Sequence, residues 1–356
     1  MTGKERVLAA IEHQEPDRVP VDVWYTPEMR DKLASALGIP KPDNDLEPDS
    51  LLLELGHDLF KVTVGPCASF YLSEEECYRD EWGIGWRRVD YGHGHYTEPV
   101  EHPLADLEDP EGFEIPDFND PSRYKKARYL VKNYGDEYAI VGEMACTLFE
   151  LSWYLRGYER VLIDLKRNKE FMKAFLRRLK EWARAAGRNF TEAGVDILFL
   201  GDDFGMQDRM IISPELFREF FKPIYAELFE EFKALKPDIK IAYHSDGNIE
   251  PIIPDFIEIG LDILNPVQPR SMDPKKLKKL YGRNLTFWGT MDNQGTIPFG
   301  SPEDVIAEVK ARLRDVAPGG GLILGPAHNV QSITPVENML AFYEAVKRYG
   351  TYPIRV

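Results

Sequence analysis

The chain has 356 residues, of which 43% are apolar and 12% aromatic, so it carries enough material for a large buried core and is not a disordered protein. Its 60 acidic side chains outnumber the 44 basic ones and leave a formal net charge of -16, which repels polyanions. We therefore expect no nucleic-acid partner and no anionic membrane surface as a partner.

Three cysteines, Cys67, Cys77 and Cys146, have spacings that match neither a disulfide framework nor a Cys-x-x-Cys metal site. This usage indicates a reducing compartment. No apolar run approaches the ~20 residues that a membrane-spanning helix needs. The sequence therefore predicts a cytoplasmic protein.

Eight short apolar segments recur along the chain, each rich in β-branched residues and followed by a polar or glycine-bearing turn. Amphipathic helical patterns lie between most of them, and four of these begin with proline in the first turn. The predicted strands are 19–24, 59–64, 138–143, 197–202, 240–244, 263–266, 285–289 and 322–325, and the clearest helices are 214–235, 251–259, 302–316 and 335–349.

Continuous apolar strands that alternate with helices predict a parallel sheet covered by helices. Eight such units predict an α/β protein in which residues 1–356 form a single (β/α)8 TIM barrel domain. An open doubly wound sheet is the alternative, but the sequence lacks the Gly-x-Gly-x-x-Gly turn expected of it. Because barrel active sites lie at the C-terminal ends of the strands, polar residues there are the candidates for chemistry.

Residues 73–118 break the alternation after the second predicted strand. Insertions after barrel strands commonly form lids or substrate-facing hairpins, and a plain structural flap is the alternative. We expect a lid-like insertion here. It gathers aromatic and histidine side chains among charges and glycines, namely Trp82, Trp86, Tyr91, His93, His95 and Tyr96.

Two histidines and two carboxylates at predicted strand ends form a candidate metal site. His244 and Asp246 stand two apart beside Gly247, a spacing that lets both side chains bend toward one point on a tight turn. With His328 and Glu143 they offer the imidazole and carboxylate ligands that suit Zn²⁺. The alternative is that these groups bind substrate and one another without a metal.

The adjacent pair Asp202 and Asp203 is a candidate acid–base couple, because one carboxylate beside another has a raised proton affinity. Neighbours in a strand point to opposite faces, so at most one reaches the barrel mouth while the other orients a helix or loop. We assign Asp203 to the site. The catalytic candidates are then His244, Asp203 and His328.

Further strand-end residues are candidates for binding a substrate, since they combine aromatic surface with a few polar groups. The same side chains could serve as ordinary core. The candidates are Trp24, Tyr25, Phe204, Gln207, Asn265, Gln268, Trp288, Asp292 and Asn329, with Phe149 and Tyr154 as additional aromatic lining.

Six segments in this order carry a resemblance that covers nearly the whole chain. Together they resemble the uroporphyrinogen decarboxylase superfamily, and the resemblance implies the same (β/α)8 barrel. The segments are RVLAAIEHQEPDRVP at 6–20, GDDFGMQ at 201–207, HSDGN at 244–248, ILNPVQP at 263–269, TFWGTMDNQ at 286–294 and GGGLILGPAHNVQ at 319–331.

The resemblance implies one of two chemistries, decarboxylation of uroporphyrinogen or methyl transfer with a corrinoid carried on a separate protein. The decarboxylases carry an Arg-Gln-Ala-Gly-Arg stretch after the first strand, whereas this chain has DVWYTP at 22–27. Without those arginines a polyanionic tetrapyrrole has little to hold it. The motif pattern therefore favours the methyltransferase branch.

The chain also departs from the methyltransferases that methylate a thiol. The resemblance implies His-x-Cys and a later Cys as zinc ligands, but Asp246 and His328 stand at the two cysteine positions. Nitrogen and oxygen ligands leave a metal a stronger Lewis acid than thiolates do. This favours the opposite half-reaction, in which a methyl group leaves oxygen or nitrogen.

The resulting prediction is an O-demethylase-like methyltransferase that moves a methyl group from a small methoxylated substrate, expected to be aromatic, to the cobalt of a small corrinoid protein, with zinc as the metal. A decarboxylase of a small carboxylated substrate, in which Asp203 protonates a carbanion, remains an alternative, as does a non-catalytic binding protein. A homodimer is compatible with the sequence.

Overall fold

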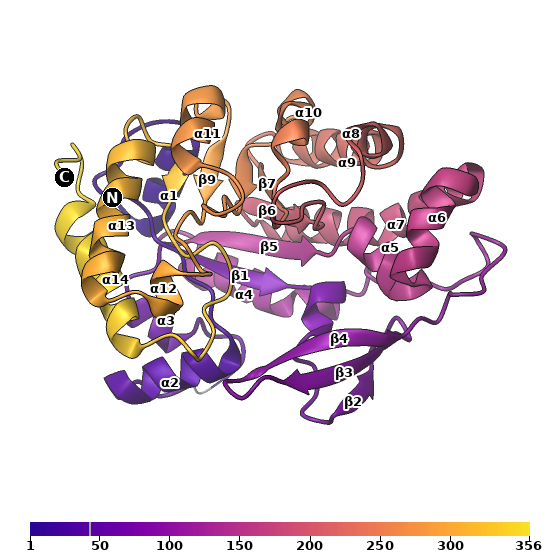
Figure 1. Cartoon of the computed structure of the whole chain (residues 1–356), viewed down its shortest axis with the longest axis horizontal. Helices are drawn as coiled ribbons and strands as arrows, with labels where there is room; N and C mark the ends of the chain where they lie inside the picture. Colours follow the sequence, from indigo (N-terminus) through magenta and orange to yellow (C-terminus); the bar gives the residue numbers. More distant parts are fainter. Residues whose placement is uncertain (43) are drawn as a thin grey trace.

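The computed structural model describes residues 1–42 and 44–356. Seven parallel strands form one curled sheet, in the order β1, β5, β6, β7, β8, β9 and β10, with helices on its outer face (Figure 1). The predicted α/β barrel class is confirmed. The strands are β1 (Leu59–Thr63), β5 (Ala139–Ala145), β6 (Ile197–Gly201), β7 (Lys240–His244), β8 (Ile263–Asn265), β9 (Thr286–Trp288) and β10 (Leu322–Ile323).

The first predicted strand, 19–24, does not form a regular strand and is corrected to an isolated bridge between Val21 and Leu324. It still closes the ring: the amide of Leu324 donates to the carbonyl of Pro20 at 2.8 Å, and the amide of Asp58 donates to the carbonyl of Val21 at 3.2 Å. Pro20 has no N–H, and the amide of Val21 donates to the Asp58 carboxylate instead of a neighbouring strand. Because two successive backbone amides are missing from the pairing, this segment forms no continuous ladder of strand hydrogen bonds.

The helices follow the strands, and the predicted helix at 214–235 is divided into two α-helices by a π-helical turn at Phe217–Phe221. No helix in residues 1–42 and 44–356 is long and apolar enough to cross a membrane. The α-helices are α1 (Gly3–Ile11), α2 (Pro27–Leu37), α3 (Ser50–Glu54), α4 (Lys125–Tyr134), α5 (Phe149–Arg156), α6 (Tyr158–Arg167), α7 (Lys169–Ala193), α8 (Pro214–Leu216), α9 (Lys222–Leu235), α10 (Ile253–Glu258), α11 (Pro274–Tyr281), α12 (Thr296–Phe299), α13 (Pro302–Val316) and α14 (Val336–Tyr349).

Helix α1 covers the N-terminal end of the barrel. Its Val7 and Ile11 pack against the inward-facing side chains of the strands, which form a core separate from the larger one between sheet and helices. The carbonyl of Ala10 accepts from the amide of Gly321, directly before β10. The barrel is therefore filled from below by α1 and has only its C-terminal end free for a site.

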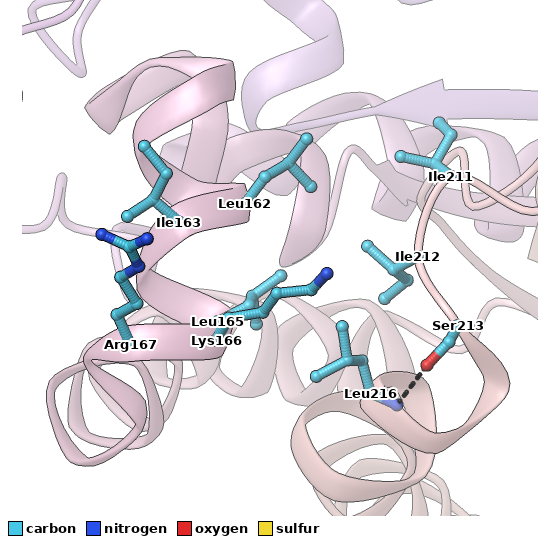
Figure 2. A pocket seen from close by; sticks show the side chains of 9 residues that line it. All are labelled: Leu162, Ile163, Leu165, Lys166, Arg167, Ile211, Ile212, Ser213 and Leu216. Carbon is cyan, nitrogen blue, oxygen red and sulfur yellow. Dashed lines mark hydrogen bonds between the residues drawn. The ribbon is translucent and has the colours of Figure 1, made fainter.

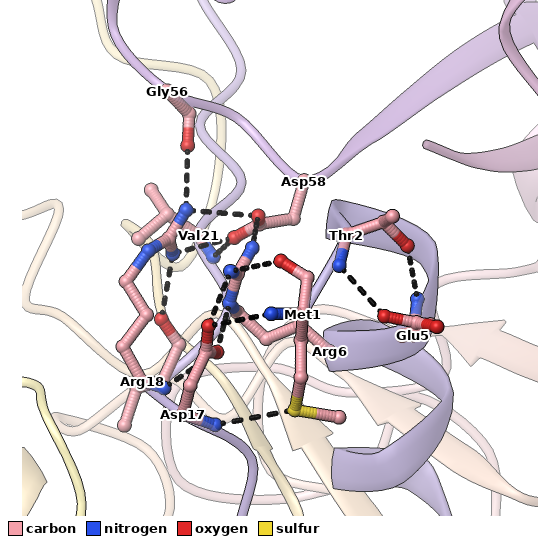
Figure 3. A network of polar contacts seen from close by, with 10 residues as sticks. Met1, Thr2, Glu5, Arg6, Asp17, Arg18, Val21, Gly56 and Asp58 are labelled. Atoms are coloured by element: carbon pink, nitrogen blue, oxygen red, sulfur yellow. Dashed lines mark hydrogen bonds and ion pairs between the residues drawn. The ribbon is translucent and has the colours of Figure 1, made fainter. Parts of the chain in front are cut away.

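A buried ion network fastens α1 to the start of β1 (Figure 3). Arg6 Nη1 donates to Asp58 Oδ1 at 2.5 Å, and Arg18 Nη1 donates to Asp58 Oδ2 at 2.7 Å. Arg6 Nε also donates to Asp17 Oδ1 at 2.7 Å. Burial of these charges is tolerable only because each has a partner.

Residues 73–118 include a three-stranded antiparallel sheet of β2 (Cys77–Arg79), β3 (Gly85–Asp90) and β4 (His95–Glu101), which lies beside β1 and α5 (Figure 1). The carboxylate of Asp80 organises its first turn by accepting from the amide of Ile84 at 3.0 Å and from Trp86 Nε1 at 2.8 Å. The sheet is the excursion expected after the second barrel strand. Its action as a lid stays a prediction.

Candidate active site

A cavity of about 490 Å³ lies at the C-terminal ends of the barrel strands. Thr63 ends β1, Ala145 ends β5, Asp203 follows β6 and His244 ends β7, and all four line it. The side chains that close it from outside come from α5, from the antiparallel sheet and from residues 70–71, which lie between β1 and that sheet. They are Phe70, Tyr71, Trp86, Tyr96, Thr97, Glu98, Pro99, Glu150, Trp153 and Tyr154.

Three of the predicted metal ligands come together at the edge of this cavity. His244, Asp246 and His328 each offer one ligand atom, and these atoms lie within 4.8 Å of one another. His244 Nε2 is 3.7 Å from Asp246 Oδ1, which is buried and has no hydrogen-bond partner among the described residues. A buried carboxylate oxygen without a donor is costly, so a cation at this point would remove a penalty.

The imidazole of His244 is held in one orientation by hydrogen bonds on its far side. Its Nδ1 lies 2.6 Å from Asn265 Oδ1, and Asn265 Nδ2 donates to the carbonyl of Trp288 at 3.0 Å. Because that amide nitrogen is occupied, Asn265 presents its oxygen and His244 Nδ1 must donate. Nε2 is then the nitrogen whose lone pair is available in the neutral imidazole, and it faces the cavity as a metal ligand requires.

The loop after β7 is fixed by Gln268, whose Oε1 accepts from the amide of Gly247 at 2.6 Å. Gly247 has φ +77° and lies against the backbone of Gly205, where a Cβ would approach within 2.4 Å. Only glycine fits there. Asn265 and Gln268, predicted to touch substrate, thus position the metal candidates from behind.

Glu143 lies in the cavity wall but outside the group of three ligand atoms, so the structure does not bring this fourth predicted metal ligand together with the other three. Lys61 Nζ is 2.8 Å from Glu143 Oε1, and Thr63 Oγ1 donates to the other oxygen. Burial acts to raise the pKa of Glu143, but the Lys61 ammonium and these hydrogen bonds outweigh it and lower the pKa. Glu143 is occupied as the partner of a buried lysine.

The two adjacent aspartates point to different places. Asp202 is fully buried and accepts from the amides of Leu148 and Glu150 at the start of α5. Asp203 lines the cavity, and its Oδ1 lies 3.7 Å from His244 Nε2. Burial and the Asp246 carboxylate raise the pKa of Asp203. Asp203 is thus the member of the pair that faces the site.

The remaining substrate candidates divide into those that line a cavity and those that do not. Trp24 and Asn329 line the main cavity, and with Tyr25 they also line an adjoining one of about 280 Å³. Phe204 is a correction: it is fully buried and stacks on Phe149 with 5.1 Å between ring centroids. Both rings belong to the core between barrel and helices.

Three further candidates lie away from the cavity and are also corrected. Gln207 is exposed on the loop after β6. Asp292 Oδ2 accepts from Arg270 Nε at 2.9 Å. Trp288 is buried inside the barrel, where its ring lies 5.9 Å from that of Trp24, below the cavity floor.

Several lining residues were not predicted. Lys61 and Thr63 lie on the inward face of β1, and a lysine in the middle of the apolar run LFKVT was the available signal. Glu150 follows β5 in the apolar stretch TLFELSWYL, where a carboxylate among buried positions was equally visible. Cys67 and Cys146 could not be recognised as lining residues from the sequence, because they reach the same cavity wall only when β1 and β5 pair.

A second hollow of about 510 Å³ lies between α6 and residues 211–216 (Figure 2). It shares no lining residue with the main cavity. Its wall is aliphatic apart from Lys166, Arg167 and Ser213, and it contains no His, Cys or carboxylate that could carry the chemistry outlined above.

The barrel with a polar, aromatic-walled cavity over its strand ends defines the class as a TIM-barrel protein with a candidate active site at the usual place. Residues 83–349 match the family model described as uroporphyrinogen decarboxylase (URO-D). The chain therefore belongs to the URO-D family.

Some relatives of the chain are named as methyltransferases, and one from Crocosphaera subtropica, 24% identical over 179 residues, is named as uroporphyrinogen decarboxylase. The chain is 27% identical over 202 residues to methylated-thiol–coenzyme M methyltransferase from Methanosarcina mazei, which covers 56% of this chain and 50% of that protein. It is 23% identical over 363 residues to methylcobamide:CoM methyltransferase MtaA from Methanosarcina barkeri strain Fusaro, covering 98% of each. The match thus spans about half of the first relative and nearly all of the second.

A solved structure shows the same fold. It is described as a methyltransferase from Methanosarcina mazei, and it superposes with a TM-score of 0.71 and 21% identity over 98% of this chain and 99% of that one.

Proposed function

We propose that the protein is a corrinoid-protein-dependent methyltransferase of the O-demethylase type, which moves a methyl group from a small methoxylated aromatic substrate to the cobalt of a small partner protein. The observation that carries this proposal is the group of two imidazoles and one carboxylate at the wall of an aromatic cavity. No thiolate belongs to that group among the described residues.

The donor set fits a zinc ion. His244 presents Nε2 to the cavity, Asp246 Oδ1 is buried without a partner among the described residues, and His328 would complete three protein ligands, which would leave a fourth position for substrate. Bound through nitrogen and oxygen, zinc supplies Lewis acidity toward an ether oxygen. The Asn265 hydrogen bond sets the His244 ring angle that such coordination needs.

The protein's own side chains orient the substrate and exclude water. Trp24 lies 6.0 Å from the His244 ring and 6.5 Å from the His328 ring, so an aromatic surface borders the candidate ligands directly. Trp86 and Tyr154 pack edge to face at 5.2 Å on the opposite, outer wall. A flat aromatic ether held between such walls would have its methyl carbon exposed to the partner's cobalt.

The charge of the cavity disfavours a polycarboxylate substrate. Among the described lining residues Lys61 is the one basic side chain, and Glu143 already neutralises it. Glu98, Glu150 and Asp203 add acidic groups to the wall. A tetrapyrrole with several carboxylates therefore finds no group of arginines to hold it, so decarboxylation of uroporphyrinogen is not supported by this site.

The test compares methyl donors with one acceptor. Zinc-loaded protein is mixed with cobalt(I) corrinoid and, in separate reactions, with methoxybenzene or with a methylated thiol, and methylcobalt formation is followed by its absorbance. The proposal expects stoichiometric methylcobalt and phenol from the ether. Turnover of the thioether alone would overturn the O-demethylase assignment while retaining methyl transfer.

A further inference from the structure

Three carboxyl groups meet where β6 ends and α5 begins, and the proposed function gives none of them a chemical role. Asp202, Asp203 and Glu150 are linked directly, since the amide of Glu150 donates to Asp202 Oδ1 at 3.0 Å and the amide of Asp203 donates to Glu150 Oε2 at 3.2 Å. Asp202 and Glu150 are buried and Asp203 is partly exposed, and neighbouring carboxyl groups in such a setting do not all ionise readily together. One carboxyl of the group must retain a proton.

The hydrogen bonds show where negative charge is best stabilised. Asp202 accepts from two amides at the start of α5 and from the hydroxyl of Tyr225. Asp203 accepts from the amide of Asp246 at 2.8 Å and faces His244. Backbone amides that donate to a carboxylate favour its charged form, most of all at a helix start.

Glu150 has the weakest support for a charge. Its side chain accepts from the hydroxyl of Tyr154 at 2.8 Å and from one amide. No cation among the described residues contacts it, and the lysine of the cavity, Lys61, is paired with Glu143. It is buried, with 8% of its surface exposed, yet it lines the cavity. Burial and the two aspartates raise the pKa of Glu150 well above its usual range.

We propose that Glu150 is the general acid of the reaction, the group that protonates the departing oxygen. This rests on the proposed function. Cobalt(I) supplies the electron pair of the new cobalt–carbon bond and becomes cobalt(III). The methyl–oxygen bond breaks with its electron pair left on oxygen, the Glu150 proton passes to that oxygen to give the phenol, and water later returns a proton to Glu150.

Asp203 bridges Glu150 to the candidate metal ligands. Its amide contacts Glu150, and its carboxylate lies 3.7 Å from His244 Nε2. A substrate oxygen near His244 is therefore one residue away from the acid. This arrangement makes Asp203 a positioning residue and separates its role from that of Glu150.

The variant Glu150→Gln keeps the size of the side chain and one acceptor oxygen, which can still accept from the amide of Asp203, and it replaces the other oxygen by an NH2 group that carries no transferable proton. We would measure methyl transfer from methoxybenzene, 4-cyanoanisole and 4-nitroanisole. The leaving group of methoxybenzene is a basic phenoxide that needs a proton, so the rate with this donor should fall by about 100-fold or more in the variant. The leaving group of 4-nitroanisole is a weakly basic phenoxide, so the rate with this donor should fall only a few-fold. An equal loss for all three donors, or no loss, would overturn the assignment.

A second measurement does not depend on turnover. The infrared carbonyl band of a protonated buried carboxyl should be present at neutral pH in the wild type, absent in Glu150→Gln, and retained in Asp203→Asn and in the surface control Glu170→Gln. A band lost in Asp203→Asn and kept in Glu150→Gln would assign the proton to Asp203 and refute the proposal. If the wild type demethylates no ether, the proposed function fails, and the band alone then reports whether Glu150 holds a proton.

Discussion

The imidazole of His244 owes its orientation to a residue that does not touch the cavity. Asn265 accepts from Nδ1 at 2.6 Å and is itself fixed by the carbonyl of Trp288. Replacing Asn265 by Ala should weaken zinc binding by about 10 to 100-fold, because the ring loses both its tautomer and its angle. Competition with a chelator measures this. Unchanged affinity in Asn265→Ala, with the fold intact, would contradict the account.

The control for that experiment is Glu143. Its carboxylate is paired with Lys61 and lies outside the group of three ligand atoms. Glu143→Gln should therefore leave zinc affinity within a few-fold of the wild type. A loss as large as that of His244→Ala would restore Glu143 as a ligand.

Lys278 on α11 gives a pH dependence that is independent of the site. Burial lowers the pKa of Lys278 to about 8 from its model-compound value of 10.5, and its Nζ donates to the carbonyl of Gly320 at 2.6 Å. The unfolded chain therefore binds this proton more tightly than the folded one, so the lysine costs stability below pH 8 and the cost disappears as pH rises toward 10.5.

The comparison with Lys278→Met isolates this effect. Between pH 7 and pH 9.5 the free energy of unfolding of the wild type should rise by about 1 to 2 kcal/mol relative to the variant. Urea unfolding at the two pH values measures the difference. A difference that stays constant, or that falls with pH, would show that Lys278 is not desolvated in the fold.

At the level of elements, the attachment of α1 to the barrel depends on one carboxylate. Asp58 accepts from Arg6, from Arg18 and from the amide of Val21 at the point where the ring closes (Figure 3). Asp58→Ala would leave the buried guanidinium of Arg6 with Asp17 as its one remaining acidic partner. We expect a loss of about 3 to 5 kcal/mol in the free energy of unfolding.

An exposed ion pair provides the matched control. Asp31 contacts Lys41 at 3.0 Å on the surface, with about half of the aspartate side chain exposed. Asp31→Ala should cost less than about 1 kcal/mol, because solvent screens such pairs. Chemical denaturation of both variants measures the contrast, and equal losses would mean that the Asp58 network does not hold α1.

The elements also show what the sequence could predict. Seven of eight strands were found because parallel barrel strands are continuous apolar runs, and strand ends then named His244, Asp203 and His328 correctly as neighbours of one cavity. The segment at 19–24 was wrongly predicted as a strand, because the amide of Val21 donates to the side chain of Asp58, a residue distant in the chain, and not to a neighbouring strand.

The errors at the site have a common physical cause. Whether an aromatic residue after a strand turns inward or outward depends on the helices that pack beside it, and Phe204 turned outward onto Phe149. Likewise, whether a carboxylate is free to bind a metal depends on nearby cations. Lys61 on β1 forms an ion pair with Glu143 on β5. The spacing of residues along the chain predicts neither the Phe204–Phe149 contact nor the Lys61–Glu143 ion pair.

For the whole molecule, a barrel of URO-D family fold carries nitrogen and oxygen donors at the cavity, while Cys67 and Cys146 line the wall without joining the ligand group. That separation underlies the proposed direction of methyl transfer. Thiolate ligands would suit a metal that keeps a thiol nucleophilic, whereas imidazole and carboxylate suit one that activates an ether oxygen.

X-ray absorption at the zinc edge of the zinc-loaded protein tests this claim most directly. The account predicts one zinc per chain surrounded by nitrogen and oxygen at ~2.0 to 2.2 Å, with the signal lost in His244→Ala and His328→Ala. A zinc–sulfur distance of ~2.3 Å in the wild type would place a cysteine on the metal and contradict it.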